Sequence, residues 1–221
     1  METSDLQERF SRQILLPGVG EAGQQKWAQS QVALAGEGEA FEAAVLALAS
    51  SGLGTLSLQS KAPLDLSAWQ KRFPDTSFCA MDPGNLSWDA AALLVLTETE
   101  EWRRAINRAL RGKSRPAFYG WTAGSGFALF LAANRPEGCP CFECFEGLNP
   151  KAFSPGKSET KRLLGALAAS EVLRWILKGE SPLLDQVHLT LLDAGLSVDH
   201  PVFSSPKCPA HLTAAGAKVT P

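Results

Sequence analysis

The chain has 221 residues, of which 45% are hydrophobic and 20% are charged, and its formal net charge is −2. This length supports one sizeable core, so we expect a single domain over residues 1–221. The small negative charge argues against a nucleic-acid partner, and no apolar run approaches the roughly 20 residues that a membrane span requires. The first five residues are polar and acidic, unlike a secretory signal, and predict a cytoplasmic protein.

Residues 1–30 are polar and amphipathic and are expected to form an N-terminal helical arm, with Pro17 and Gly18 ending a first helix. A βαβ unit follows. It consists of an apolar run at 32–35, the turn Gly36-Glu37-Gly38, an alanine-rich helix over about 39–51 and an alternating run at 55–58. Such a unit implies a parallel sheet with a right-handed crossover.

The remaining pattern alternates strands and helices. Residues 60–90 are broken repeatedly by proline and glycine and are expected to be loops around one short helix. Strands are predicted at 90–97, 117–120, 126–133 and 187–192, with a charged helix at 100–111. A later helix, ending at Gly179, is predicted to bury Leu163, Leu167, Leu173, Ile176 and Leu177. The fold class is therefore α/β: a Rossmann-like, mostly parallel sheet flanked by helices.

Four metal-ligand side chains form two closely spaced pairs. Cys141 and Cys144 form a CxxC within a long loop predicted at 137–160, and Cys208 and His211 form a CxxH near the end of the chain. Two such pairs supply the four ligands of a tetrahedral structural zinc, which would staple the loop to the C-terminal part. Cys139 either competes as a ligand or is a free thiol. Cys79, His188 and His200 are interpreted as unrelated to the metal.

The turn at Gly36 and Gly38 has the position of a phosphate-binding loop but not its chemistry. Phe41 stands where the third glycine of G-x-G-x-x-G is expected, and Glu37 and Glu39 place negative charge where phosphates would lie. The alternative is a strand–helix turn that needs only the backbone freedom of glycine.

Three separated stretches together resemble the ThiF/MoeB/HesA family, relatives of ubiquitin-activating enzymes. They are RFSRQILLP with the following GVGEAGQ, over residues 9–24; the βαβ unit, over 32–58; and PCFECF, over 140–145, with CPAH at 208–211. The resemblance covers most of residues 9–212 and is poor over 60–90. It implies an enzyme that uses ATP and magnesium to adenylate the C-terminal glycine of a small ubiquitin-like or sulfur-carrier protein, and a homodimer.

The same resemblance assigns roles to single residues. Arg12 matches an arginine that reaches ATP across the dimer interface, and Gly36 and Gly38 match the phosphate loop. Glu98 matches a carboxylate on the magnesium side. Cys141, Cys144 and Cys208 match zinc ligands, with His211 in place of the fourth cysteine.

The departures from the family pattern fall at residues that would bind the nucleotide. Ser60 replaces the ribose-binding aspartate, Val95 replaces the first aspartate of D-x-x-D, and the stretch carrying further ATP ligands has no counterpart. The sequence therefore predicts a zinc-containing protein-binding module with weak or lost ATP chemistry. The alternative is an active adenylyltransferase that uses other cations, for example Lys61 or Arg72. A nicotinamide-dependent oxidoreductase is disfavoured by Phe41 and the missing ribose acid.

Overall fold

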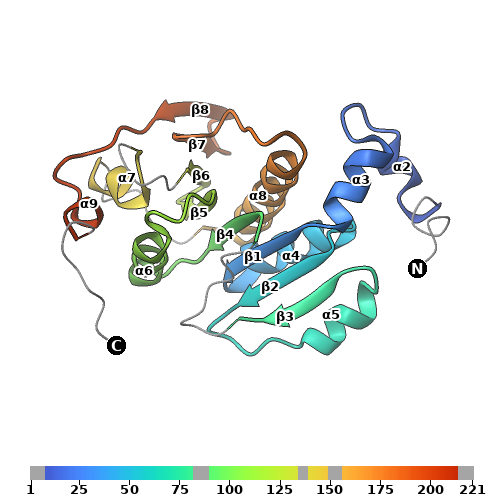
Figure 1. The fold of residues 1–221 in the computed structure, drawn as a ribbon. Coiled ribbons are helices and arrows are strands. Elements are labelled where there is room, and N and C mark those ends of the chain that lie inside the picture. Colours follow the sequence, from blue (N-terminus) through green and yellow to red (C-terminus); the bar gives the residue numbers. More distant parts are fainter. Residues whose placement is uncertain (1–7, 82–89, 134–138, 149–155, 214–221) are drawn as a thin grey trace.

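A computed structural model describes residues 8–81, 90–133, 139–148 and 156–213. Its centre is an eight-stranded sheet in the order β3-β2-β1-β4-β5-β6-β7-β8 (Figure 1). The pairings from β3 to β5 are parallel, and those from β5 to β8 are antiparallel. The strands are β1 Gln31–Gly36, β2 Thr55–Gln59, β3 Ser77–Ala80, β4 Ala92–Leu96, β5 Ala117–Ala123, β6 Gly126–Ala132, β7 Gln186–Leu191 and β8 Leu196–Pro201. The α/β class is confirmed, with a mixed sheet.

The parallel half has the strand order 3-2-1-4-5. The strands β1 and β4 pair side by side, with Gly36 opposite Leu96 at their carboxyl ends. The chain leaves these two ends in opposite directions across the sheet, and ligands of open α/β sheets bind in the crevice that forms at such a point. This edge of the sheet is called the strand-end crevice below.

Helices cover both faces of the sheet. They are α2 Ser11–Ile14, α3 Gly20–Ala28, α4 Gly38–Ser50, α5 Leu66–Arg72, α6 Glu100–Leu110, α7 Phe142–Leu148, α8 Ser158–Lys178 and α9 Pro209–Thr213. Figure 1 shows α6, α7 and α9 gathered at one side of the molecule and α2 and α3 at the other. Among the described residues, no helix combines the length and apolarity that crossing a bilayer requires.

Two hydrophobic cores lie on opposite faces of the sheet because side chains alternate along each strand. Val32 and Leu34 of β1 belong to the core that α4 and α8 cover. Ala33 and Ala35 belong to the other core, which contains side chains of α6, α7 and α9. Strands buried on both faces explain why β1 and β4 read as continuous apolar runs.

The helix α8 buries only part of the predicted face: Ile176 is buried, and Leu173 and Leu177 pack partly buried against the core. Leu163 and Leu167 are 39% and 40% exposed, so their predicted burial is wrong. A β-carbon at Gly165 would collide with the backbone oxygen of Ala40, which shows how closely α8 approaches α4. Small residues permit that approach, so the side of α8 with Gly165 and its alanines packs inward and turns the two leucines out. Its buried residues are Thr160, Leu164, Gly165, Ala168, Ala169, Val172 and Ile176.

The N-terminal arm holds the end of α8. Its first short helix ends at Ile14, as its glycines and proline predict, and Gly20 begins α3. The indole of Trp27 donates to the carbonyl of Leu173 at 3.0 Å, and the Lys26 ammonium donates to that of Leu177 at 2.9 Å. The last four carbonyls of a helix lack partners within it, so the bond from Lys26 satisfies the Leu177 carbonyl, which would otherwise need water.

Three elements were not predicted. The region expected to be loops contains β3 besides the short helix α5, and β8 follows β7 as an antiparallel neighbour. The predicted loop at 137–160 contains α7. Parts of these regions, at 82–89, 134–138 and 149–155, lie outside the described residues, as do residues 1–7 of the arm.

Candidate functional site

The four predicted metal ligands lie together in one buried cluster. Cys141 precedes α7 and Cys144 lies in its first turn, while Cys208 and His211 lie at α9. The Cys141 sulfur is 3.8 Å from that of Cys144 and 3.7 Å from that of Cys208, and the Cys144 sulfur is 3.5 Å from Nε2 of His211. All four ligand atoms lie within 4.8 Å of one another.

These spacings fit a tetrahedral zinc ion. Zinc–sulfur bonds of about 2.3 Å and tetrahedral angles place two sulfurs about 3.8 Å apart. The distances from the Cys141 sulfur to the sulfurs of Cys208 and Cys144 are 3.7 and 3.8 Å. Three thiols and an imidazole therefore form a site that could hold a metal ion. Cys139 is not part of this cluster, although it lies only two residues earlier.

Asn107 of α6 organises the residues around Cys141. It is fully buried, donates to the Cys141 sulfur at 3.5 Å and to Oε1 of Glu143 at 3.1 Å, and accepts from the backbone N–H of Phe142 at 3.1 Å. Groups that hydrogen-bond to ligands fix their orientation and tune metal affinity. No local sequence pattern identifies Asn107 as a partner of Cys141, because the contact joins segments 34 residues apart.

The other ligands also have partners. The backbone N–H of Ser205 donates to the Cys144 sulfur at 3.4 Å, and the Ser204 hydroxyl lies 3.3 Å from Nδ1 of His211. The Cys141 thiol donates to Cys144, which lowers the pKa of Cys144 to about 5 and raises the pKa of Cys141.

Two ion pairs fasten α7 to α6. Arg108 donates to both oxygens of Glu143, at 3.0 and 2.9 Å, and Arg104 contacts Glu146 at 2.6 Å. Both carboxylates are buried. Burial raises the pKa of Glu146, although the hydrogen bond from Arg104 opposes that effect. The pairs hold the helix that follows Cys141 and contains Cys144 against α6.

The glycines of the strand-end crevice have structural uses. A β-carbon at Gly36 would collide with the carbonyl oxygen of Leu96 and would lie 3.1 Å from the ring of Phe41. Gly36 is therefore required by the approach of β1 to β4, whatever the ligand. Gly38 begins α4 with φ of +72°, in the left-handed region, and nothing lies within 4 Å of where its β-carbon would stand.

The carboxylate of Glu37 lies between the two central strand ends. Its Oε1 accepts hydrogen bonds from the hydroxyls of Thr97 and Thr99, which follow β4. Its Oε2 is buried without a hydrogen-bond partner in the described structure. The Glu37 side chain thus links the end of β1 to the turn that follows β4. Neither threonine was predicted, although T-x-T directly after a buried strand is a readable signal.

A second carboxylate stands in the first turn of α4. Glu39 accepts from the Ser158 hydroxyl and pairs with Arg162 at 3.2 Å, both from α8. The bond from Ser158 is the main cause that lowers the pKa of Glu39, so this side chain is held as an anion. The positive end of the α4 dipole therefore already faces charges of this chain.

Glu98 follows the carboxyl end of β4 as well. It accepts from the hydroxyl of Thr122 at 2.9 Å, and that hydroxyl in turn accepts from the backbone N–H of Gly156 at 2.8 Å. Lys61 reaches the same edge, where its ammonium lies 3.4 Å from the Thr99 hydroxyl and 5.2 Å from the ring centroid of Trp102. Three cations, Lys61, Arg103 and Arg162, and three glutamates thus meet around the ends of β1 and β4, and Arg103 donates to the carbonyl of Thr97.

Arg12 is not brought to this crevice within one chain. It is exposed on α2, and its neighbour Gln13 donates to the carbonyl of Ser50 at 3.2 Å. Ser50 is the last residue of α4, whereas Gly38 is the first. A helix of that length spans about 20 Å, so Arg12 lies at the far end of α4 from the glycine turn.

Comparison with known proteins gives structural relatives only. No family model and no curated protein sequence matches the chain. E. coli MccB with succinimide superposes with a TM-score of 0.73 at 18% identity, covering 91% of this chain and 74% of that one. E. coli MccB with ATP gives 0.67 at 18%, covering 85% and 68%. PaaA gives 0.69 at 18%, covering 93% and 76%.

The chain has the fold of MccB and PaaA. At these identities the likeness shows the fold alone, and it agrees with the fold that the sequence resemblance implied. MccB has been solved with ATP and with an MccA peptide, and both are ligands of MccB itself.

Proposed function

We propose that this protein is a zinc-containing binding module built on an adenylyltransferase fold, with weak or lost ATP chemistry. The observation that carries the proposal is the position of Glu37 in the strand-end crevice, bonded to Thr97 and Thr99. A phosphate entering there would meet a carboxylate rather than open backbone amides. The neighbouring Glu39 adds a second charge of the same sign at the N-terminus of α4.

Electrostatics support this conclusion. Adenylation requires cations and a metal to offset the charge of the reacting phosphates. Lys61 is drawn toward Thr99 and the Trp102 ring, and Arg162 pairs with Glu39. The negative charges of Glu37, Glu39 and Glu98 offset these cations. The aspartate that would hold the ribose is replaced by Ser60. Each group that stabilises the charge of the transition state is typically worth about 10²-fold in rate. Loss of several such groups therefore lowers the adenylation rate by orders of magnitude.

The proposed metal is zinc with a structural role. Four protein ligands close the coordination sphere and leave no position for a catalytic water. The ligands join α7 to α9, so the ion would staple the C-terminal segment to the body. Reduced thiols suit a cytoplasmic protein.

The proposed partner is a small ubiquitin-like or sulfur-carrier protein, or a peptide. MccB has been solved with the peptide MccA, which supports a partner of this size. The hairpin of β7 and β8 offers an apolar surface for it, because large hydrophobic side chains there are exposed. These are Leu191, Leu192, Leu196 and, just beyond the hairpin, Phe203.

A homodimer completes the proposal. Leu15 and Leu16, beside Arg12, are 81% and 54% exposed, and leucine pairs left in water favour a protein contact. Because Arg12 lies far from its own crevice, a second copy could place its Arg12 at the crevice of the first.

Three measurements test the proposal. Calorimetric titration with ATP and magnesium is expected to show no binding at micromolar affinity, and ATP–pyrophosphate exchange with small glycine-tailed proteins is expected to stay at background. Robust exchange that disappears in Glu98→Ala or Arg12→Ala would instead establish the alternative, an active adenylyltransferase. Elemental analysis is expected to give close to one zinc per chain. Stably folded metal-free protein would contradict the structural role proposed for zinc.

A further inference from the structure

A chain of four polar side chains crosses β7 and β8, the last two strands of the described sheet. Nδ1 of His188 lies 2.6 Å from Oδ1 of Asp199, and Nε2 of the same ring lies 3.1 Å from the hydroxyl oxygen of Thr190. The Thr190 oxygen lies 3.1 Å from the hydroxyl oxygen of Ser197. A hydroxyl within hydrogen-bond reach of an imidazole that a carboxylate orients is the arrangement of an activated nucleophile.

The pairing of the two strands explains why these side chains touch. Both contacts between the strands join directly opposite residues. The N–H of Val202 donates to the carbonyl of Asp185 at 2.9 Å, and ladder bonds fall on alternate pairs from there. The two polar pairs therefore occupy the non-hydrogen-bonded positions, where facing side chains approach most closely. The same alternation turns the backbone N–H groups of Ser197 and Asp199 towards the open edge of β8.

The hydrogen bonds of the chain run in one direction when the imidazole is neutral. An ionised carboxylate only accepts, so Nδ1 of His188 carries the proton that bonds to Asp199. Nε2 is then an acceptor, and Thr190 donates to it. Because this bond uses the single hydroxyl proton of Thr190, the Thr190 oxygen accepts from Ser197. The base at His188 thus acts, through one hydroxyl, on the proton of Ser197.

The Ser197 end of the chain is open to solvent. Ser197 is exposed, and the His188 side chain is 28% exposed. A substrate therefore reaches the Ser197 oxygen without any movement of the fold. The backbone N–H groups of Ser197 and Asp199, at the same edge, are donors of the kind that stabilise the oxyanion of acyl transfer.

An apolar flank of α8 lies on the same face of the sheet. Gly120 shares a cross-strand row with His188, and a β-carbon there would approach α8 to 2.9 Å. Gly165 of α8 faces α4, so the exposed Leu163 and Leu167 lie on the opposite flank of the helix, towards β7. These two leucines offer an apolar surface to a substrate at the polar chain.

We propose that Ser197 is a nucleophile that takes the acyl group from activated esters with an apolar acyl chain. The Ser197 oxygen bonds to the ester carbonyl carbon while its proton passes to Thr190 and the proton of Thr190 passes to Nε2 of His188. Asp199 stabilises the resulting imidazolium. The bond to the leaving oxygen breaks, and the proton returns along the same path to that oxygen.

The products of this step are acyl-Ser197 and an alcohol or phenol, and hydrolysis by water then releases the acid and restores the serine. The site is independent of the proposed function, because none of its four residues lies in the strand-end crevice or the cysteine cluster.

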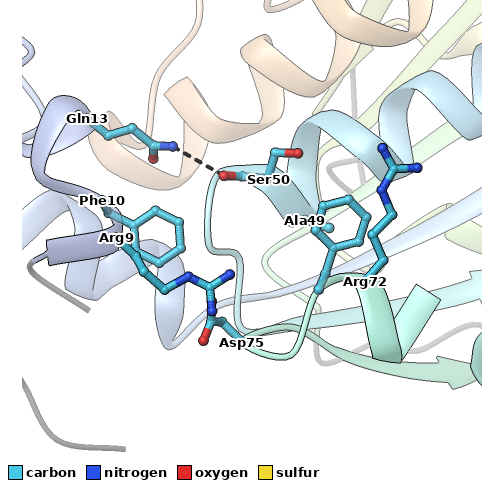
Figure 2. Close-up of a pocket in the computed structure, with 8 residues that line it drawn as sticks. Arg9, Phe10, Gln13, Ala49, Ser50, Arg72 and Asp75 are labelled. Carbon is cyan, nitrogen blue, oxygen red and sulfur yellow. Dashed lines mark hydrogen bonds and ion pairs between the residues drawn. The ribbon is translucent and has the colours of Figure 1, made fainter. Parts of the chain in front are cut away.

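Reaction of the full chain with p-nitrophenyl butyrate tests the proposal. Release of p-nitrophenolate measures the rate, and peptide mass spectrometry after acid quenching locates the butyryl group. Ser50 is an internal control, because it is also exposed and Figure 2 shows its carbonyl, rather than its hydroxyl, accepting the bond from Gln13. We expect Ser197 to be acylated about 10²-fold faster than Ser50.

Variants separate the members of the chain. Ser197→Ala and His188→Gln are expected to lower the rate about 10²-fold, and Thr190→Val, which keeps the shape but breaks the path of the proton, should do the same. His200→Gln removes an exposed histidine from the opposite face of β8 and should react as the natural chain does. Leu167→Ser should slow transfer from the butyrate ester but not from the acetate ester.

Three results would overturn the proposal. They are acylation of Ser197 no faster than that of Ser50, a Ser197→Ala protein with the full rate, and a rate that depends on His188 but not on Thr190. The last result would show simple catalysis by an exposed imidazole. Circular dichroism melting checks that each variant is folded, and the comparison of Ser197 with Ser50 in the natural chain requires no variant.

Discussion

Asn107 and Cys141 are joined by a hydrogen bond of 3.5 Å from the buried side-chain amide to the sulfur. Asn107→Ala removes this bond and those to Glu143 and Phe142, leaving buried groups without partners. We expect zinc affinity to fall about 10- to 100-fold, measured by competition with a chromogenic chelator. Glu101→Ala, an exposed change on the same helix, should leave the affinity unchanged. Equal affinities of both variants would show that Asn107 does not orient the site.

Glu37→Ala should open the strand-end crevice to phosphates. The change removes a carboxylate from the N-terminus of α4 and releases the hydroxyls of Thr97 and Thr99. We expect ATP affinity, measured by calorimetry, to rise about tenfold or more. Glu42→Ala removes the same charge from an exposed position farther along α4 and should change little. A gain of the same size in both variants would indicate a long-range charge effect and no local blockage.

The two glycines of the turn should differ in their tolerance of alanine. Gly36→Ala forces a methyl group into the backbone of Leu96, which overpacking data place at about 3 kcal/mol of lost unfolding free energy. Gly38→Ala meets no atom and incurs only the strain of its positive φ, about 1 kcal/mol. Urea denaturation of both variants measures the difference. A larger loss at Gly38 would contradict the packing role assigned to Gly36.

Glu146 should impose a pH dependence on stability. Burial raises its pKa in the folded protein, so the folded state keeps this proton to a higher pH than the unfolded state does. The free energy of unfolding should therefore fall as pH rises from the unfolded pKa through the folded one. Glu146→Gln should lack this fall in urea titrations across that window, and the exposed Glu101→Gln should retain it. A curve for Glu146→Gln that matches the natural chain would refute the assignment.

The exposed leucines of the arm should control self-association. Sedimentation analysis of the natural chain is expected to give twice the chain mass, and Leu15→Asp should give the monomer because a charge cannot be buried without a partner. Leu192→Asp, at an exposed leucine of the β7–β8 turn, should remain dimeric. A natural chain that stays monomeric up to about 100 µM would remove the dimer from the proposal.

The sequence predicted the parts of the fold that depend on local pattern. The βαβ unit around Gly36 is read from an apolar run, a glycine turn and a helix, and the four metal ligands from their paired spacing. The strands β3 and β8 are largely exposed and so lack the alternation that identifies half-buried strands. Leu163 and Leu167 of α8 were wrongly assigned to its buried face, because Gly165 and the alanines beside it pack closer to α4 than leucines could.

The surroundings of the candidate site depended on contacts that no local pattern shows. The bonds of Asn107 to Cys141 and of Glu37 to Thr97 join residues 34 and 60 positions apart. Both carry the chemistry of their sites, because one orients a ligand and the other occupies the crevice. Only the sheet order, which places β1 beside β4 and α6 beneath α7, brings such pairs together.

The cysteine cluster also determines which part of the molecule opens first. The helix α9 has five residues, too few to persist without tertiary contacts, and its segment is tied to α7 through Cys208 and His211. Withdrawal of a bound ion would release this segment while the parallel strands keep their partners. Amide hydrogen exchange of residues 202–213 would then quicken before that of β1 or β4, so the end of the chain would report metal loss as a local opening event.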